Sequence, residues 1–556
     1  MTIFLYYNAL VIQIILHYNK NKSINKKAVL RALPDRIRKM KRTIQIKDGY
    51  LYIPIYTGQE NHLLSFYVKD ENAEAEKIME FKIPVDMSKE EEYFGDYYAE
   101  IPVWKYLGKT MIIEGEFPMI MGMRIQNRKK RRQFVTNRPR IHFTANRGWT
   151  NDPNGMIYKD GLYHLYFQYN PFDVRWENMS WGHAISKDML HWAQLDTVMF
   201  PDEDGTMYSG CGVINERELL GFSKDTLLYY YTEAGGTNPW SQGKEFTQKI
   251  AYSNDMGETL QKLPDPCIGT IYRENRDPKI FWHPETEAYI MVLWLKGNDF
   301  GIFRSTDLKN WDLTQELYLE DAWECPDLFQ LTNAEGEKKW FFWSADGYYF
   351  PGDFDGYHFE NSGERHKAYI SKLPYAAQTF SGIKDRTISI PWLRLENDGR
   401  LFTSAYGLPT EFSYRVIRGR YFLLQRPVRE FYEQLEPADP WRIRKEDGKI
   451  IYENRDHTKA FVSSMELSPD HGDVFLWEIN GSSISYNPHS GSLMIDGEKF
   501  QAGLDHHKLE LIVDDRILEI FFEDGLSYGA FPLKEREIFF SMEEDQIDYV
   551  DFFEID

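Results

Sequence analysis

The segment Ala184-Ile185-Ser186-Lys187-Asp188 decides the fold, because it ends an apolar, strand-like run in the pattern Ser-x-Asp. The pattern recurs at residues 251–255, 303–307 and 342–346, so that successive serines lie 67, 52 and 39 residues apart. Each copy is typical of a strand that runs into a polar turn. The spacings are close to the roughly 40 to 50 residues that one four-stranded blade of a β-propeller needs.

Helical periodicity is nearly absent from residues 138–436, apart from Val428 to Leu435. Short strands and turns must therefore fill this long region. A propeller of about five blades is the most economical all-β solution, since a sandwich of that length would be unusual. We predict that residues 138–436 form a five-bladed β-propeller.

Strand-like alternation also flanks this region on both sides. Residues 43–126 predict a small N-terminal accessory β domain, and residues 437–556 predict a C-terminal β-sandwich with acidic turns. Residues 127–137 contain five consecutive cations, Arg128 to Arg132. Such a run can be a nuclear-localisation signal or a nucleic-acid patch, but at a domain junction of an acidic chain we interpret it as a solvated basic linker.

The N-terminal residues 1–42 need a separate interpretation. The apolar run from Ile3 to Tyr18 is shorter than the roughly 20 residues that span a bilayer, and it lacks the flanks of a signal peptide. Lys20 to Arg42 contain ten basic residues and one acid, which makes contact with a membrane surface conceivable. We interpret residues 1–42 as a disordered or membrane-proximal extension, or as sequence upstream of a protein that begins at Met40. The lack of a convincing export signal favours a cytoplasmic location over a secreted one, and we expect no stable membrane association.

Composition narrows the class of partner. The chain has 65 basic and 86 acidic residues, a net charge of −21, which would repel nucleic acid. Aromatic residues make up 16% of the chain and suit both β-sheets and sugar stacking. The three cysteines are widely spaced and form neither a disulfide framework nor a CxxC metal site. We therefore expect no nucleic-acid partner, no metal and no cofactor.

Three carboxylates are the strongest candidates for chemistry. Asp152, Asp277 and Glu324 each lie in a short segment rich in Trp, Asn, Arg, Pro or Gly, and they are separated by 125 and 47 residues. Such separations place them on different blades, whose inner strands converge on one axial funnel. Taken singly, an Asp before Pro is most often a turn residue, and Glu324 could be a buried, paired acid. The joint occurrence of the three segments favours an active site.

These segments, 149–155, 276–278 and 323–327, resemble the signature of glycoside hydrolase family 32, the β-fructofuranosidases, which include levanases, inulinases and invertases. Further motifs of the family follow in the expected order at residues 161–171, 181–186, 208–210 and 375–379. The similarity extends from about Arg138 to the C-terminus. The N-terminal β domain resembles the accessory domain of some bacterial levanase-like members.

The resemblance implies a retaining mechanism, which requires two carboxyl groups about 5 to 5.5 Å apart. Asp152 is then the nucleophile, Glu324 is the acid/base, and Asp277 binds two fructose hydroxyls in the transition state. We expect neighbouring carboxylates to raise the pKa of Glu324, and Asp277 to remain ionised beside Arg276. The implied sugar-binding residues are Asn151, Gln168 and Ser209 as hydrogen-bonding groups, Trp176, Tyr208 and Trp392 as apolar walls, and Arg276.

We predict a retaining hydrolase that releases fructose from β-fructans of the levan or inulin type, from sucrose, or from both. A sucrose or sucrose-phosphate hydrolase, a fructosyltransferase and a non-catalytic fructan-binding protein remain open as alternatives. Linkage preference, exo or endo attack and oligomeric state are left open as well.

Overall fold

The computed structural model describes residues 39–71, 73–86, 94–131, 135–454, 459–468 and 474–555. Our interpretation of the N-terminal extension therefore lies, up to residue 38, outside the described residues. No helix in these ranges is long and apolar enough to cross a membrane. The chain divides into two compact units, one of residues 1–132 with 171–173, and one of residues 133–170 with 174–556.

The first unit contains two antiparallel sheets with the strand orders β1-β6-β3-β4 and β5-β2-β7. Its elements are β1 (Lys39–Gln45), β2 (Tyr50–Ile55), β3 (Asn61–Lys69), β4 (Glu76–Pro84), β5 (Tyr97–Pro102), β6 (Thr110–Glu116), helix α4 (Phe117–Gly122) and β7 (Gln126–Arg128). Strand β1 begins four residues before the boundary we expected at residue 43. Strand β7 pairs with β2 through Arg128, so the basic run begins inside a sheet rather than in a linker.

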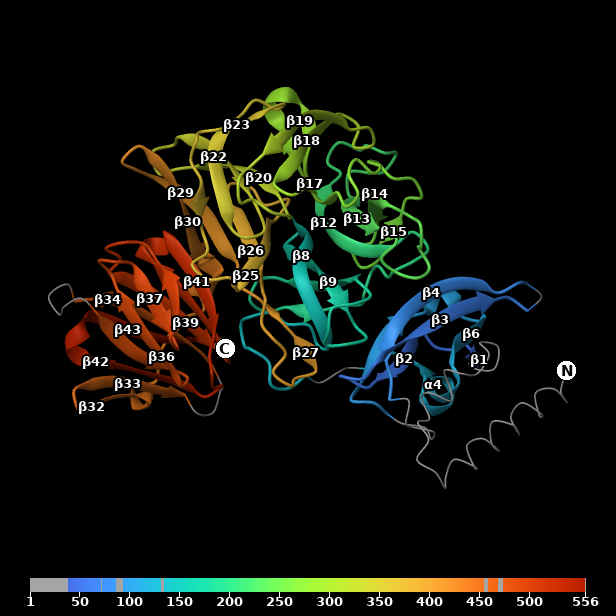
Figure 1. Cartoon of the computed structure of the whole chain (residues 1–556), viewed down its shortest axis with the longest axis horizontal. Coiled ribbons are helices and arrows are strands. Elements are labelled where there is room, and N and C mark those ends of the chain that lie inside the picture. Colours follow the sequence, from blue (N-terminus) through green and yellow to red (C-terminus); the bar gives the residue numbers. More distant parts are fainter. Residues whose placement is uncertain are drawn as a thin grey trace, which may run out of the picture. The chain divides into compact units, whose positions relative to one another are not determined.

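The second unit begins with five sheets that follow one another along the chain, from teal to orange in Figure 1. The first contains β8 (Gly148–Lys159), β9 (Leu162–Asn170), β10 (Ser180–Ser186), β11 (Ala193–Gln194) and the later β27 (Phe402–Thr403); the second contains β12 (Thr206–Ile214), β13 (Leu227–Ala234), β14 (Phe246–Ser253) and β15 (Gln261–Lys262). The third contains β16 (Arg276–His283), β17 (Ala288–Lys296), β18 (Asp299–Ser305) and β19 (Asp312–Tyr318); the fourth contains β20 (Asp327–Thr332), β21 (Lys338–Trp343), β22 (Tyr348–Phe354), β23 (Phe359–Asn361) and β24 (His366–Lys367). The fifth contains β25 (Pro374–Thr379), β26 (Thr387–Leu393), β28 (Ala405–Tyr406), β29 (Thr410–Ile417) and β30 (Arg420–Pro427). Within each sheet, the main strands pair antiparallel in chain order, and β27 adds to β8 in parallel.

The side chains of β17 show how these sheets pack. Met291 and Leu293 belong to a core shared with the second sheet, whereas Val292 and Trp294 belong to a core shared with the fourth. Alternate residues of a strand point to opposite faces, so the third sheet is covered on both faces by its neighbours. A further core joins the first sheet to the second, and another joins the fourth, the fifth and the first.

All four Ser-x-Asp segments follow a strand and enter a polar turn, but only three of them stand at the same place in a sheet. Ser186, Ser253 and Ser305 each end the third strand of a sheet, and each hydroxyl bonds to the Asp two residues on. Ser344 is different, because it follows the second strand of the fourth sheet. The equivalent turn there is at Asp355, whose Oδ1 accepts hydrogen bonds from the N–H groups two and three residues later. The fourth copy of the sequence pattern therefore marks a strand that enters a turn, but not the turn that the other three copies share.

The C-terminal part consists of two antiparallel sheets that enclose a common core, which is a β-sandwich. One sheet contains β31 (Glu436–Pro437), β34 (Ala460–Leu467), β39 (Lys508–Asp514), β40 (Ile517–Phe522), β41 (Ser527–Pro532) and β43 (Ile547–Ile555). The other contains β32 (Ile443–Glu446), β33 (Lys449–Asn454), β35 (Phe475–Ile479), β36 (Ser482–Asn487), β37 (Ser492–Ile495), β38 (Glu498–Gln501) and β42 (Ile538–Glu543). The short helix α5 (Arg429–Tyr432) precedes β31 within the region expected to be helical.

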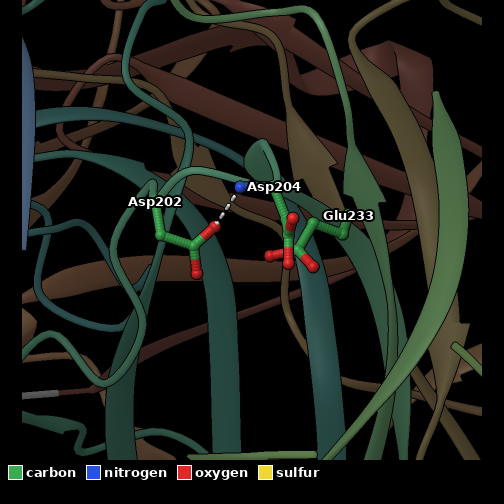
Figure 2. Close-up of side chains that lie close together, drawn as sticks. All are labelled: Asp202, Asp204 and Glu233. Atoms are coloured by element: carbon green, nitrogen blue, oxygen red, sulfur yellow. Dashed lines mark hydrogen bonds between the residues drawn. The ribbon is translucent and has the colours of Figure 1, made fainter. Parts of the chain in front are cut away.

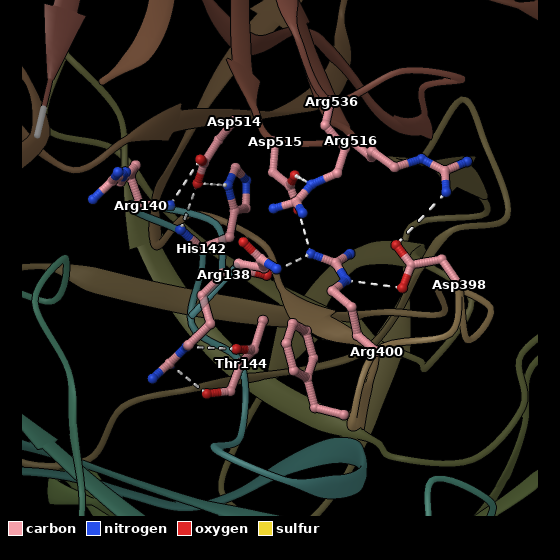
Figure 3. A network of polar contacts seen from close by, with 12 residues as sticks. Arg138, Arg140, His142, Thr144, Asp398, Arg400, Asp514, Asp515, Arg516 and Arg536 are labelled. Atoms are coloured by element: carbon pink, nitrogen blue, oxygen red, sulfur yellow. Dashed lines mark hydrogen bonds and ion pairs between the residues drawn. The ribbon is translucent and has the colours of Figure 1, made fainter. Parts of the chain in front are cut away.

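A polar network ties the segment before β8 to this sandwich (Figure 3). Asp514 accepts hydrogen bonds from the backbone N–H groups of Arg140, Ile141 and His142, and its Oδ2 lies 2.9 Å from His142 Nδ1. On the other side of the ring, His142 Nε2 lies 3.3 Å from a carboxylate oxygen of Glu519. The network holds residues 140–142, which precede β8 in the chain, against the sandwich.

Candidate active site

The ten residues predicted for the site all line one cavity of about 980 Å³. They are Asn151, Asp152, Gln168, Trp176, Tyr208, Ser209, Arg276, Asp277, Glu324 and Trp392. Most lie on or just before the first strand of a sheet: Asn151 and Asp152 on β8, Tyr208 and Ser209 on β12, Arg276 and Asp277 on β16, and Glu324 before β20. Residues that lie far apart in the sequence therefore meet at one cavity.

Irregular backbone directs these side chains into the cavity. The strand register shifts between Thr150 and Pro153 in β8, between Met207 and Gly210 in β12, between Arg276 and Lys279 in β16, and between Tyr375 and Gln378 in β25. A β-bulge breaks the regular alternation of side chains and re-aims one of them. The fourth sheet uses another device: Glu324 and Cys325, just before β20, both have positive φ angles, 46° and 37°.

Asp152 is held by hydroxyl and amide groups. Ser209 Oγ donates a hydrogen bond of 2.7 Å to Asp152 Oδ2, and Gln168 Nε2 donates to the same hydroxyl at 3.3 Å. Burial raises the pKa of Asp152 above its usual range, the charge of Glu324 raises it further, and the Ser209 hydrogen bond opposes both.

Glu324 has a different set of partners. Arg276 Nη2 donates to Oε1 at 2.5 Å, and the Tyr375 hydroxyl donates to Oε2 at 2.9 Å. The Arg276 guanidinium also lies 3.9 Å from the centroid of the Trp294 ring. A planar cation stacked in this way loses little freedom when it binds a carboxylate.

Asp277 is the most buried of the three carboxylates and has a positive φ of 64°. Its N–H donates to Thr232 Oγ1 at 3.0 Å, and its Oδ2 accepts from the N–H of Cys325 at 3.2 Å. Burial raises the pKa of Asp277 to about 7, although Arg276 opposes the shift. Burial and the two other carboxylates thus oppose the ionised form that we expect for Asp277, while the Arg276 guanidinium, 3.8 Å away, favours it.

The Cys325 thiol connects two of the carboxylates. Its Sγ lies 3.5 Å from Asp277 Oδ2 and 3.8 Å from Asp152 Oδ2, and Glu324 is its neighbour in the chain. Sequence reasoning missed Cys325 and Tyr375 as site residues. Both lie inside segments that carried the family resemblance, 323–327 and 375–379, which was the available signal.

The aromatic residues form the walls of the cavity. Trp176 is 49% exposed and lies edge-on to Tyr208, with ring centroids 6.5 Å apart. Trp392 packs edge-on against Tyr375 at 6.2 Å, and also against Trp149 at 6.1 Å. Aromatic rings and polar groups thus line the same cavity, as in sites that bind sugars.

A second acidic cluster lies among residues that do not line the cavity. Asp202, Asp204 and Glu233 point toward one another in Figure 2, with oxygens within 4.8 Å. Lys249 contacts Asp204 at 2.6 Å and Glu233 at 2.5 Å, and Lys262 contacts Asp202 at 2.6 Å. Because lysines neutralise these carboxylates, the cluster is an ion-pair network that supports the second sheet.

Comparison with known proteins places the chain among carbohydrate-active enzymes. Residues 142–427 match the model of the glycosyl hydrolases family 32 N-terminal domain. A levanase of Bacillus subtilis (strain 168) is 29% identical over 447 residues, which is 70% of this chain and 65% of the levanase. An invertase of Debaryomyces hansenii is 37% identical over 284 residues, 46% of this chain and 52% of the invertase. The alignments thus span less than two thirds of either relative.

Solved structures share the fold. The exo-inulinase from Aspergillus awamori superposes with a TM-score of 0.68 at 23% identity, over 76% of this chain and 99% of that one. A family 32 glycoside hydrolase from Bifidobacterium adolescentis has a TM-score of 0.64 at 18% identity, over 92% of this chain and 98% of that one. The match of the family model to more than half of the chain shows that this protein belongs to glycosyl hydrolase family 32.

Proposed function

We propose that this chain is a retaining β-fructofuranosidase that releases fructose from the ends of β-fructans and from sucrose by double displacement. The observation that carries the proposal is the meeting of Asp152, Asp277 and Glu324 at one cavity with different hydrogen-bond partners. The names of the relatives, levanase, invertase and exo-inulinase, support the same class of substrate.

In the first step, Asp152 attacks the anomeric carbon of the terminal fructosyl unit while Glu324 protonates the departing oxygen. The bond to the leaving group breaks and a covalent fructosyl-enzyme forms. Ser209 orients the attacking carboxylate through its hydrogen bond to Oδ2. In the second step Glu324, now ionised, accepts a proton from water while the water oxygen attacks the anomeric carbon. The bond between that carbon and Asp152 breaks, which frees fructose and restores the Asp152 carboxylate.

Asp277 acts as a binder of the transition state in this proposal. Fructose hydroxyls donate hydrogen bonds to its ionised form, and such bonds strengthen as positive charge develops on the ring. Because hydroxyl donors favour the carboxylate over the acid, bound substrate lowers the pKa of Asp277 again.

We also propose that the five sheets are the blades of a five-bladed β-propeller with the cavity at its axis. Three observations support this architecture: each sheet shares a core with the next, the fifth shares one with the first, and β27 pairs with β8. Residues 43–126 would then be an accessory β domain and residues 437–556 a sandwich attached to the last blade.

Product analysis tests the proposed function. The protein is incubated in parallel with sucrose, inulin and levan, and the products are separated by chromatography. Free fructose supports hydrolysis, longer oligomers indicate transfer to a sugar, and unchanged substrate indicates binding alone. The control is Asp152→Asn, which keeps the shape of the side chain but removes the nucleophile; we expect turnover to fall by at least about 10³-fold. Activity near that of the unmodified protein would end the nucleophile assignment.

A further inference from the structure

Tyr375 lies beside Glu324 but has no part in the catalytic proposal so far. It lines the cavity from β25, and its hydroxyl donates a hydrogen bond of 2.9 Å to Glu324 Oε2. Glu324 Oε1 accepts from Arg276 instead. The two oxygens of this acid therefore have separate donors, one charged and one neutral.

A chain of backbone hydrogen bonds sets the distance between Tyr375 and Glu324. The N–H of Ala376 donates to the oxygen of Ala345 at 2.9 Å, and the N–H of Ala345 donates to the oxygen of Glu324 at 3.1 Å. Ala376 lies within the strand bulge with a positive φ of 51°, and it packs with Ala345 and Cys325 in a small buried cluster. Since packed interiors leave little room for movement, this cluster holds the two side chains at a fixed spacing.

The Tyr375 ring is held in place by two neighbours. The guanidinium carbon of Arg394 lies 4.2 Å from the ring centroid, and Arg394 Nε donates to the backbone oxygen of Lys372 at 2.9 Å. Trp392, which pairs with Tyr375 across the two strands, packs edge-on against the ring at 6.2 Å. The hydroxyl is therefore directed at Glu324 before any substrate binds.

The Tyr375 hydroxyl also keeps its proton. Burial and the negative charge of Glu324 raise the pKa of Tyr375 well above its usual value, so this group remains a hydrogen-bond donor. A hydrogen bond to a carboxylate is roughly twice as strong as one to a neutral acceptor. The bond from Tyr375 is therefore stronger after Glu324 has lost its proton than before.

We propose that Tyr375 is a positioning residue that stabilises the negative charge that Glu324 acquires when it gives its proton to the leaving oxygen. This inference rests on the proposed function. In the first step the leaving oxygen keeps the electron pair of the bond that breaks and takes the proton, while the electron pair of the O–H bond stays on Glu324. Tyr375 acts on that charge, so its contribution is made in the transition state and matters where departure needs a proton.

The test compares Tyr375→Phe with the unmodified protein on sucrose and on an activated aryl fructoside. Sucrose needs a proton on its leaving oxygen, whereas an activated phenolate departs without one. The phenyl ring keeps the packing against Arg394 and Trp392. We expect kcat/KM for sucrose to fall by about 5- to 30-fold, which corresponds to the difference between a charged and a neutral hydrogen bond, and kcat/KM for the aryl fructoside to fall by less than about 3-fold.

A second comparison separates this role from a merely structural one. Glu324→Gln has no proton to give, so no charge develops beside Tyr375. Adding Tyr375→Phe to Glu324→Gln should therefore lower kcat/KM for sucrose by less than about 3-fold. An equal loss from Tyr375→Phe in both backgrounds would overturn the inference, and so would equal losses on sucrose and the aryl fructoside.

The matched control is Tyr414→Phe. Tyr414 belongs to the same sheet, on β29, and its hydroxyl donates to the backbone oxygen of Glu337 at 2.8 Å, but it does not line the cavity. We expect it to leave kcat/KM unchanged on both substrates, and a loss on sucrose as large as that of Tyr375→Phe would overturn the inference while leaving the proposed function standing. Absence of fructose release by the unmodified protein from every substrate would instead overturn the proposed function, and the inference with it.

Discussion

Asp152 and Glu324 share one cavity but have different hydrogen-bond donors. Asp152 accepts from the Ser209 hydroxyl, and Glu324 accepts from the Arg276 guanidinium. A hydroxyl donor supports Asp152 as an anion without supplying charge, whereas Arg276 and Tyr375 hold both oxygens of Glu324. Two carboxyl groups with unlike surroundings can take the roles of nucleophile and proton donor.

The role of Glu324 predicts a dependence on the leaving group. Glu324→Gln removes the proton donor but keeps the hydrogen-bonding shape, so substrates with a poor leaving group, such as sucrose, should lose far more rate than an activated aryl fructoside. The measurement is kcat/KM on both substrates. Equal losses on the two would contradict the acid/base assignment.

The raised pKa of Asp277 predicts a difference between two pH profiles. An acid with a pKa of about 7 is ionised only above that pH, so kcat/KM for sucrose, which reports the free enzyme, should fall as the pH drops through about 7. The profile of kcat, which reports the complex, should hold to lower pH because fructose hydroxyls stabilise the anion. If kcat and kcat/KM fell at the same pH on the acid side, substrate binding would not shift the pKa of Asp277.

Motifs were sufficient to predict eight of the ten lining residues, because each of the eight lies in a recognisable segment; Trp176 and Trp392 lie outside these segments. The hydrogen bond from Tyr375 to Glu324 and the position of the Cys325 thiol were not predictable in this way. The Tyr375 hydrogen bond depends on the strand bulge after Tyr375, and the position of the thiol depends on the positive φ angles of Glu324 and Cys325. Neither feature produces a repeating pattern in the sequence.

At the scale of elements, strands of the third, fourth and fifth sheets are joined by a buried ion pair. Lys279 of β16 lies 3.2 Å from Asp327 Oδ2 of β20, and Thr379 of β25 donates to the same oxygen through its N–H and its hydroxyl. Both charged side chains are almost fully buried. The pair therefore sets the spacing of three strands that carry site residues.

Asp327→Asn should destabilise the protein by about 3 to 5 kcal/mol, because it leaves the buried ammonium of Lys279 without its counter-charge. The measurement is the free energy of unfolding in urea. The double variant Lys279→Met/Asp327→Asn removes both charges and should recover part of the loss. A double variant that is less stable than the sum of its two single variants would contradict this account.

The turns at the strand ends show what the Ser-x-Asp pattern marks and what it does not. Three Ser-x-Asp segments marked the third strand of a sheet, but in the fourth sheet Asp353 replaces the serine before Asp355. In this turn the Asp355 carboxylate still accepts hydrogen bonds from two backbone N–H groups, so the serine position of the pattern can change while the aspartate stays. At Ser344 the pattern matches a turn between the second and third strands, so it marks a strand that enters a polar turn and not a fixed place in a sheet.

At the scale of the whole molecule, His142 links the two parts of the second unit. Burial alone would lower the pKa of His142, but hydrogen bonds to Asp514 and Glu519 raise it to about 9. A histidine with a raised pKa stabilises the fold fully below its unfolded value of about 6.5, and this contribution is lost as the pH rises through about 9.

The unmodified protein should therefore lose about 3 kcal/mol of stability between pH 6.5 and roughly 9.5, and His142→Gln should be less stable at pH 6 but show a flatter profile. The measurement is thermal or urea-induced unfolding across this range. Parallel profiles for the two proteins would show that His142 is not charged in the folded state.

The order of strands and sheets along the chain was largely predictable, since alternation and turn residues are local signals. The N-terminal sheets were predicted with boundaries a few residues short at both ends, because pairing partners rather than composition decide where β1 and β7 stop.

Strand β27 adds to β8 at Phe402 and Thr403, next to the segment that carries Asp152. During synthesis, β8 leaves the ribosome long before this partner is translated. A nascent chain released before residue 403 would contain all three carboxylates and yet lack the strand that pairs with β8, so we expect catalytic competence only after that strand has been translated.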